Sequence, residues 1–263
     1  MLAFFSEPYL IIDFKAVKPF SKIARFYDEL MEYVSYKTWV NYSLSFLDIF
    51  NVKKRRFLDL ACGTLTPTIY LSEFCEDIVG LDRSIQMLEV GKAKIQKLKD
   101  KKIKLIVSDL RNFHFKKNFD AIFCFFDSMN YLLSEEDLFN CFKCAYENLE
   151  RGGAFIFDMN TIFALKEIWD KRLEVKVHKN FTSVWKNEWF EDEKISKLEI
   201  QIEWEENGLK KSVKEFHFEK GYKVEEIIDI LKKTGFRITN VYEHLKYSEP
   251  NSYTTRVQYV SIK

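Results

Sequence analysis

Three aspartates lie where successive apolar runs of the sequence end, namely Asp59, Asp82 and Asp109. In an open parallel sheet such strand ends face one crevice, and ligands bind there. A carboxylate after the second strand can accept hydrogen bonds from both hydroxyls of a ribose, about 20 residues beyond a nucleotide-binding loop. Taken singly, each aspartate is better explained as a turn or cap residue. Their joint placement after Ala61-Cys-Gly63 favours a nucleotide-type site.

The elements that would position these aspartates alternate between strand and helix. Apolar runs predict strands at 56–60, 78–81, 103–107, 119–126 and 154–157. Helical spacing of apolar residues predicts two leading helices within 19–50, then helices at 66–74, from 84, at 134–149 and at 223–234. Two further strands follow, near 236–245 and 253–262. Alternation on this scale predicts an α/β fold with a doubly wound, Rossmann-like parallel sheet.

The alternation of predicted strands and helices stops between 173 and 220, where β-rich stretches are separated by turn signals such as Asn207-Gly208. We interpret this segment as an antiparallel β meander inserted into the sheet domain. The predicted organisation is an N-terminal tail and helical cap at 1–54, a core at 55–172 and 221–263, and the inserted β lid at 173–220.

Composition excludes several classes of partner. The 263 residues carry 41 basic and 40 acidic side chains, and a net charge of +1 gives no overall field that would attract nucleic acid or a membrane surface. Five cysteines do not indicate a disulfide framework, and no run reaches the roughly 18 apolar residues that span a bilayer. We therefore expect a soluble, cytoplasmic protein, monomeric or homodimeric, without nucleic-acid or membrane partners.

Four segments carry a specific resemblance: Leu58-Asp-Leu-Ala-Cys-Gly-Thr64, Gly80-Leu-Asp-Arg-Ser-Ile-Gln-Met-Leu88, Ser108-Asp-Leu-Arg111 and Phe119-Asp-Ala-Ile122. In order and spacing they resemble successive motifs of class I S-adenosylmethionine-dependent methyltransferases. The resemblance covers roughly residues 20–160. It implies S-adenosylmethionine as cofactor and a seven-stranded sheet whose last strand is reversed.

The resemblance also implies roles for individual residues. Asp59 and the backbone at Ala61 and Gly63 would hold the methionine part, Asp82 the ribose, and Asp109 with Leu110 the adenine. The remaining residues assigned to the cofactor site are Cys62, Arg83, Met87, Phe125 and Tyr27. Tyr27 resembles a tyrosine that closes over the cofactor in related enzymes, and it is equally well explained as an aromatic residue at a helix interface.

Leu65 stands where the family pattern has its third loop glycine, and we expect that it cannot adopt glycine-only backbone angles and that it crowds the cofactor side. The sequence contains no Gly-x-Gly-x-x-Gly after its first strand, which counts against a dinucleotide-dependent dehydrogenase. Cys141-Phe-Lys-Cys144 lies inside an expected helix with no second pair, so no metal site is expected.

The loop after the fourth strand offers candidates for chemistry on the acceptor. Asp127 is a possible base and Tyr131 a possible relay, because an amine must lose a proton before or during methyl transfer. We expect transfer to the nitrogen or oxygen of a small-molecule acceptor, as in enzymes that modify amines and amino sugars. The alternatives are an RNA or protein methyltransferase and a non-catalytic module that binds S-adenosylmethionine.

Overall fold

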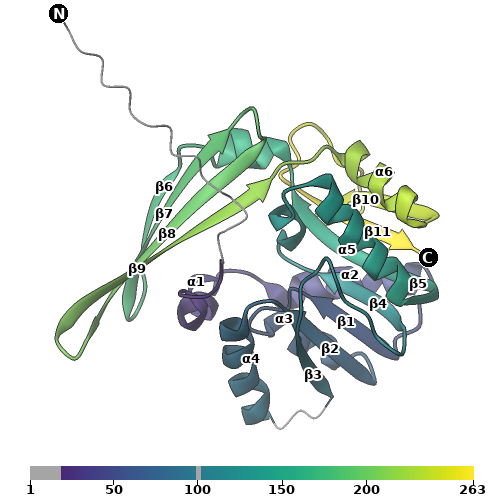
Figure 1. Cartoon of the computed structure of the whole chain (residues 1–263), viewed down its shortest axis with the longest axis horizontal. Helices are drawn as coiled ribbons and strands as arrows, with labels where there is room; N and C mark the ends of the chain where they lie inside the picture. The colour runs from purple at the N-terminus through teal and green to yellow at the C-terminus, as the bar shows by residue number, and fades with distance from the viewer. Residues whose placement is uncertain (1–18, 99–101) are drawn as a thin grey trace, which may run out of the picture.

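The computed structural model describes residues 19–98 and 102–263. Its main sheet has seven strands in the order β10-β11-β5-β4-β1-β2-β3, drawn in the lower right of Figure 1. The strands are β1 (Arg56–Leu60), β2 (Asp77–Asp82), β3 (Ile103–Val107), β4 (Phe119–Cys124), β5 (Leu149–Asn160), β10 (Ile238–Glu243) and β11 (Arg256–Ile262). β11 runs antiparallel to both of its neighbours, β5 and β10, whereas β1, β2, β3, β4 and β5 pair with one another in parallel. The predicted doubly wound sheet with a reversed last strand is confirmed.

Helices cover both faces of this sheet. One face packs against α2 (Tyr36–Ile49), α3 (Thr66–Ser72) and α4 (Ile85–Leu98), and the other against α5 (Glu135–Asn148) and α6 (Val224–Thr234). Every residue of β4 is buried, as a parallel strand with two covered faces requires. Its continuous apolar run is therefore a consequence of its central position. Among the described residues, no helix is long and apolar enough to cross a membrane.

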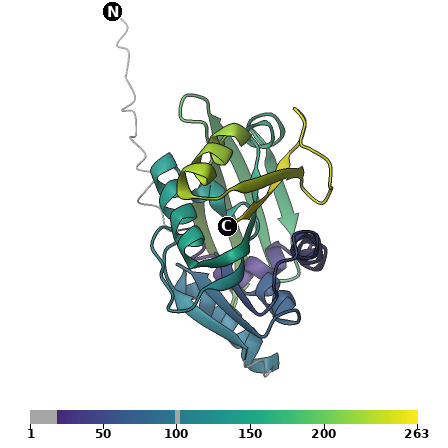
Figure 2. The same ribbon diagram turned by 90° about the vertical axis from the view of Figure 1, so that its right-hand side faces the viewer.

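The segment after β5 forms a second, antiparallel sheet that extends away from the core at the upper left of Figure 1. A short π-helical turn, η4 (Ala164–Ile168), leads into β6 (Leu173–Val177), β7 (Phe181–Phe190), β8 (Ile195–Glu206) and β9 (Leu209–Lys220). The strands pair in sequence order, so the predicted meander is confirmed. The turned view of Figure 2 shows the same two sheets.

The first leading helix is shorter than expected. A 3₁₀ turn, η2 (Ala24–Phe26), continues into α1 (Tyr27–Leu30), a single helical turn. Ile23, Leu30 and Met31 from this region share a buried apolar cluster with Phe181 and Ile200 of the second sheet. The chain before α2 therefore gains its order from the second sheet as well as from the core. Residues 1–18, the greater part of the predicted tail, lie outside the described residues.

Candidate functional site

The loop between β1 and α3 passes through the left-handed backbone region three times. The φ angles are 52° at Ala61, 54° at Gly63 and 70° at Leu65. A Cβ on Gly63 would lie 3.2 Å from Met87 Cε, so the glycine also permits a close approach of α4. Non-glycine residues in this region cost on the order of 1–3 kcal/mol each, a form of strain that recurs at functional sites.

Leu65 adopts a left-handed φ of 70° and does not crowd the site, so both expectations for this residue are wrong. Its side chain is fully buried and is not part of the lining of the main pockets described below. It points instead toward α4 and β2, where added Cβ atoms would lie 2.5 Å from Leu65 Cγ at Gly91 and 3.3 Å from Leu65 Cδ2 at Gly80. The two glycines leave the space that a leucine in this unusual conformation needs.

Asp82 ties the loop to the end of β2. Its Oδ2 accepts a hydrogen bond from the Gly63 amide at 2.8 Å, and its Oδ1 accepts one from the Ser84 amide at 2.7 Å. Burial raises the pKa of this carboxyl above its ordinary value, while the amide donors act in the opposite direction. Asp82 therefore shapes the glycine loop and also presents a carboxylate to the pocket beside it.

Asp59 lies deeper, within β1. It is 1% exposed and accepts a hydrogen bond of 2.5 Å from Thr68 Oγ1 on α3. Burial raises its pKa to about 7, against the effect of the Thr68 hydroxyl and with a small contribution from Asp82. Near neutral pH this carboxyl is poised between its two protonation states.

Asp109 is held by a residue that the sequence reasoning missed. Arg111 donates from Nε and Nη2 to the two carboxylate oxygens, each at 2.8 Å, and its Nη1 reaches Asp137 Oδ1 on α5 at 3.1 Å. This bidentate pairing lowers the pKa of Asp109. The sequence does contain a local signal for this pairing, because an arginine two positions after a strand-end aspartate lies within reach of that aspartate.

Two adjoining pockets surround the loop. The outer pocket is lined by Pro19, Phe20, Tyr27, Ala61, Gly63, Asp82, Arg83, Met87, Asp109, Leu110, Arg111, Phe126, Ser128, Tyr131, Leu132, Leu133, Asp137 and Phe218. The inner pocket is lined by Tyr27, Tyr36, Asp59, Ala61, Cys62, Gly63, Thr64, Thr66, Pro67, Phe125, Phe126 and Ser128. Every residue assigned to the cofactor site from the sequence lines one pocket or both. Tyr27, Ala61 and Gly63 are among the residues shared by the two.

A third and larger space, which we call the chamber, has a volume of about 620 Å³ and lies between the core and the second sheet. It shares Phe20, Tyr27, Phe126 and Tyr131 with the outer pocket. Its other lining residues are Ile23, Met31, Tyr33, Val34, Ser35, Trp39, Asp127, Asn160, Trp169, Arg172, Glu174, Lys176, Trp185, Asn187, Leu198, Ile200, His217, Glu219 and Arg256. The wall is mostly aromatic and aliphatic, and one side carries a group of buried charges.

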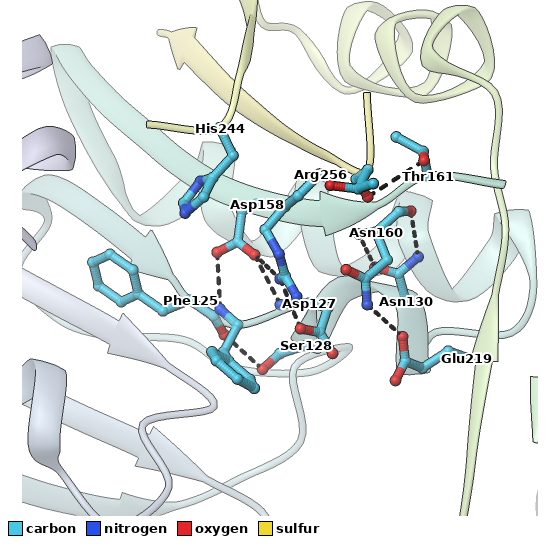
Figure 3. A network of polar contacts seen from close by, with 12 residues as sticks. Phe125, Asp127, Ser128, Asn130, Asp158, Asn160, Thr161, Glu219, His244 and Arg256 are labelled. Carbon is cyan, nitrogen blue, oxygen red and sulfur yellow. Dashed lines mark hydrogen bonds and ion pairs between the residues drawn. The ribbon is translucent and has the colours of Figure 1, made fainter. Parts of the chain in front are cut away.

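That group centres on Arg256 of β11 (Figure 3). Arg256 Nη1 lies 2.5 Å from Asp158 Oδ2 and 2.7 Å from Asp127 Oδ1. Asp158 of β5 also accepts the backbone amides of Phe126 at 2.8 Å and Asp127 at 3.0 Å. These contacts hold two consecutive residues at positive φ, 61° at Phe126 and 51° at Asp127. The loop that carries Asp127 is therefore fixed by its neighbours in the core sheet.

Glu219 brings a second carboxyl from the inserted sheet to Asp127. The two carboxyl groups line the same chamber, and each affects the pKa of the other. Asn160 Nδ2 donates to Glu219 Oε2 at 2.8 Å. Burial, then repulsion from Asp127, raises the pKa of Glu219 to about 8. Arg256 forms ion pairs with Asp127 and Asp158, whereas within residues 19–98 and 102–263 no ion pair to Glu219 is found.

Tyr131, the other predicted residue, also contacts the inserted sheet. Its hydroxyl lies 3.1 Å from His217 Nδ1 of β9. Burial, followed by the charges of Glu219 and Asp127, raises the pKa of Tyr131 well above its ordinary value, so its phenol stays neutral. Sequence spacing could not reveal His217 or Glu219 as partners, because only the docking of the inserted sheet brings them to the loop after β4.

No group of three histidine, cysteine, aspartate or glutamate side chains in the described residues is arranged to hold a metal ion. Cys141 is buried in α5, and burial raises its pKa well above the ordinary value. Cys144 on the same helix bonds weakly to the Arg111 carbonyl oxygen at 3.6 Å. These two thiols belong to helix packing.

Known proteins match the chain over most of its length. A family model for a methyltransferase domain matches residues 57–153. The chain is 28% identical over 236 residues to YqeM of Bacillus subtilis (strain 168), which carries a provisional methyltransferase name, and the match covers 89% of this chain and 93% of YqeM. The crystal structure of an S-adenosylmethionine-dependent methyltransferase from Clostridium acetobutylicum ATCC 824 has a TM-score of 0.83 at 27% identity, over 92% of this chain and 97% of that one. The protein is a class I S-adenosylmethionine-dependent methyltransferase.

The methyltransferase also shares its fold with KedS8, a sugar N-methyltransferase from Streptoalloteichus sp ATCC 53650. The TM-score is 0.78 at 15% identity, over 100% of this chain and 98% of KedS8. KedS8 is thus matched across the second sheet as well as the core, and at this identity the match describes the fold alone.

The pockets of the methyltransferase fit its cofactor on grounds independent of these comparisons. The backbone at Gly63 approaches so closely to Met87 that a Cβ would crowd it, and Asp82 stands buried beside it. A hydrogen-bond acceptor for ribose and a bare backbone for an amino acid moiety are what S-adenosylmethionine requires. The aromatic and apolar residues at the boundary with the chamber suit a sulfonium, because cations are attracted to aromatic faces.

Proposed function

We propose that this methyltransferase methylates a nitrogen or oxygen of a small molecule bound in the chamber, and that an amine is the preferred acceptor. The carboxyl groups of Asp127 and Glu219 carry this proposal, because two buried acids in the wall of a mostly aromatic and aliphatic space are suited to a cationic group. A protonated amine that enters the chamber would lose its hydration, and contacts with these carboxyl oxygens and with the surrounding aromatic rings would replace it.

In this proposal the outer and inner pockets together receive the cofactor. Asp82 accepts from the ribose hydroxyls, Asp109 and Leu110 meet the adenine, and Asp59, Ala61 and Gly63 surround the amino acid part. The other residues of the proposed cofactor site are Tyr27, Cys62, Arg83, Met87 and Phe125. S-adenosylmethionine, when bound, supplies a methyl group activated by its sulfonium sulfur.

The chain's own contribution is largely alignment. Methyl transfer by in-line displacement needs nucleophile, methyl and sulfur in one row, and holding two reactants in such a geometry can contribute roughly 7–11 kcal/mol. Tyr27 and Tyr131 line both the outer pocket and the chamber, so they stand at the passage between the two. We propose that they fix the acceptor's approach, with Tyr131 acting as a neutral hydrogen-bonding group.

An ammonium acceptor must release a proton, and we propose Glu219 as the group that takes it. Asp127 is paired with Arg256 at 2.7 Å, so its proposed role is to bind the amine and hold Glu219 in place. Glu219 lacks an arginine partner of its own and is oriented by Asn160. Burial raises the pKa of Glu219 to about 8, so its ionised form is a stronger base than an ordinary glutamate, and the proposed transfer should increase as pH rises toward 8.

Two further observations favour a small acceptor over RNA or protein. The chamber is walled by the inserted sheet, which a macromolecule would have to displace, and the net charge of +1 provides no electrostatic attraction for nucleic acid. KedS8, which shares the fold over its whole length, is a sugar N-methyltransferase. We propose that 173–220 and the N-terminal cap act as a lid over the acceptor, in a monomer or homodimer.

The proposal is tested by incubating the protein with methyl-labelled S-adenosylmethionine and separate pools of primary amines and amino sugars, hydroxylated metabolites, total RNA and denatured protein. We expect label in the amine pool, and at least a tenfold loss of that transfer in Glu219→Gln, because general base catalysis contributes about 10²–10⁴-fold. The exposed Glu203→Gln on β8 should transfer as the wild type does. Label in RNA or protein alone, or binding without transfer to any pool, would refute the proposed acceptor class.

A further inference from the structure

Glu215 of β9 is a buried carboxylate that the proposed chemistry does not use. It is 5% exposed, and its oxygens accept the backbone amides of four consecutive residues from the other end of the described chain. The distances are 2.8 Å from Phe20, 3.0 Å from Ser21, 2.5 Å from Lys22 and 3.3 Å from Ile23. One side chain of the inserted sheet thus binds the turn that precedes α1.

The charge of Glu215 matters for this arrangement. Burial acts to raise its pKa, but His217 and the amide donors outweigh that effect and the pKa lies below its ordinary value. The group is therefore ionised at neutral pH. Hydrogen bonds between amides and a carboxylate are about twice as strong as those to a neutral oxygen. A neutral amide side chain of the same shape would also place an NH₂ group against N–H donors.

The turn held by Glu215 forms part of the cofactor side of the enzyme. Phe20 lines both the outer pocket and the chamber. Its ring packs edge-on against Tyr27, with centroids 5.8 Å apart, and its carbonyl oxygen accepts a 2.7 Å hydrogen bond from Ser84 Oγ. The Ser84 amide is one of the donors to Asp82. A continuous set of contacts therefore leads from Glu215 to the carboxylate proposed for ribose.

His217 connects the same carboxylate to the acceptor side. His217 Nε2 lies 3.2 Å from Glu215 Oε2, close enough for an ion pair although poorly aligned for a hydrogen bond, and its Nδ1 meets the Tyr131 hydroxyl. The His217 ring also packs edge-on against Phe20, with centroids 4.7 Å apart. Glu215 thus contacts both the covering turn and the residue that orients Tyr131.

We infer that Glu215 is a positioning residue that closes the 19–23 turn over the outer pocket and so makes cofactor retention depend on the inserted sheet. This differs from a lid that acts on the acceptor alone, for which removal of 173–220 would leave cofactor binding intact. Phe218, three residues after Glu215 on β9, lines the outer pocket directly and supports the same dependence. The inference rests on the proposed placement of the cofactor in the outer pocket.

The first test uses the wild-type protein and S-adenosylhomocysteine as the probe. If the closed turn strengthens binding of the probe, then bound probe must stabilise the closed turn to the same extent. A saturating concentration of probe should therefore slow amide hydrogen exchange at 20–23 about tenfold or more. Unchanged exchange at 20–23 in a protein that binds the probe would overturn the inference. Failure of the wild type to bind the probe at all would instead overturn the proposed cofactor site.

The second test compares Glu215→Gln with Glu199→Gln, whose carboxylate pairs with Lys214 at 2.6 Å on the opposite face of the same sheet. In Glu215→Gln we expect exchange at 20–23 to accelerate and the calorimetric Kd for S-adenosylhomocysteine to rise, each about tenfold, with exchange in β7 and β8 unchanged. Glu199→Gln should alter neither quantity more than about twofold. An unaltered Kd in Glu215→Gln, or exchange that accelerates equally throughout the second sheet, would show a purely structural carboxylate.

Discussion

Leu65 fills the space that Gly91 leaves open on α4: a Cβ on Gly91 would lie 2.5 Å from Leu65 Cγ and 2.8 Å from Leu65 Cδ1. The contact explains how a leucine at φ 70° can occupy a loop position where glycine would be expected. Its side chain points into the core, so the Leu65 side chain does not occupy the pocket side of the loop.

Gly91→Ala should therefore destabilise the protein by about 1–3 kcal/mol, as other overpacked core positions do. A decrease in the free energy of unfolding would be informative, because replacing glycine by alanine in an exposed helix usually increases it by about 1 kcal/mol. Urea unfolding of Gly91→Ala, Leu65→Ala and the double variant gives the interaction energy. We expect the double variant to be more stable than the sum of the single effects by about 1 kcal/mol or more. Additive effects would refute the contact.

The carboxylate of Asp82 should matter for cofactor binding and that of Asp77, at the other end of β2, should not. Asp82→Asn is expected to weaken S-adenosylhomocysteine binding by roughly 10- to 100-fold, because hydrogen bonds to a charged group contribute about 1.5–3 kcal/mol. Asp77 pairs with Arg56 and Lys104 on the far edge of the sheet, so Asp77→Asn is the matched control. Calorimetric titration measures both. Equal affinities for the two variants would remove Asp82 from the site.

Glu219 should make stability depend on pH in a defined direction. Its pKa is raised from 4.5 to about 8 in the folded protein, so between these values the folded state holds a proton that the unfolded chain has released. The free energy of unfolding contributed by this group therefore falls as pH rises from about 4.5 to about 8. Glu219→Gln should gain stability relative to wild type between pH 5 and pH 9, as measured by urea unfolding, and the exposed Glu203→Gln should not. A constant difference between Glu219→Gln and wild type would contradict the assignment.

Arg256 should be needed for folding as well as for the site. Arg256→Met leaves Asp127 and Asp158 buried without their counter-charge, and we expect a loss of about 3–5 kcal/mol in the free energy of unfolding. Asp158→Asn in the same background should recover part of that loss. Arg151→Met, at an exposed position of β5, serves as control. An Arg256→Met variant as stable as the wild type would contradict the claim that Arg256 stabilises the buried carboxylates of Asp127 and Asp158.

The elements that the sequence predicted well are those encoded by local patterns. Parallel strands buried on both faces appear as apolar runs, and β3 occupies the predicted residues 103–107. Asp59 and Asp82 could be predicted as site residues because they lie at or near the ends of strands that follow one another along the chain. The motif resemblance contributed the cofactor, which periodicity alone does not name.

The contacts that the sequence did not reveal join segments that are far apart in the chain. Glu219 meets Asp127, and Glu215 meets Phe20, only because the inserted sheet docks on the core and on the N-terminal turn. The direction in which the Leu65 side chain points depends on Gly91 of α4. Such contacts follow from tertiary packing, which neither spacing nor residue type specifies.

A thermal-shift comparison of S-adenosylmethionine, S-adenosylhomocysteine and NAD tests the central claim most directly. A ligand at about 100 times its Kd stabilises the folded state by about 2.7 kcal/mol, which for a chain of this size corresponds to a rise in Tm of roughly 5–10 °C. We predict such a rise with both sulfur compounds, a smaller one in Asp82→Asn, and none with NAD. A shift with NAD alone would contradict the assignment of this protein as a methyltransferase.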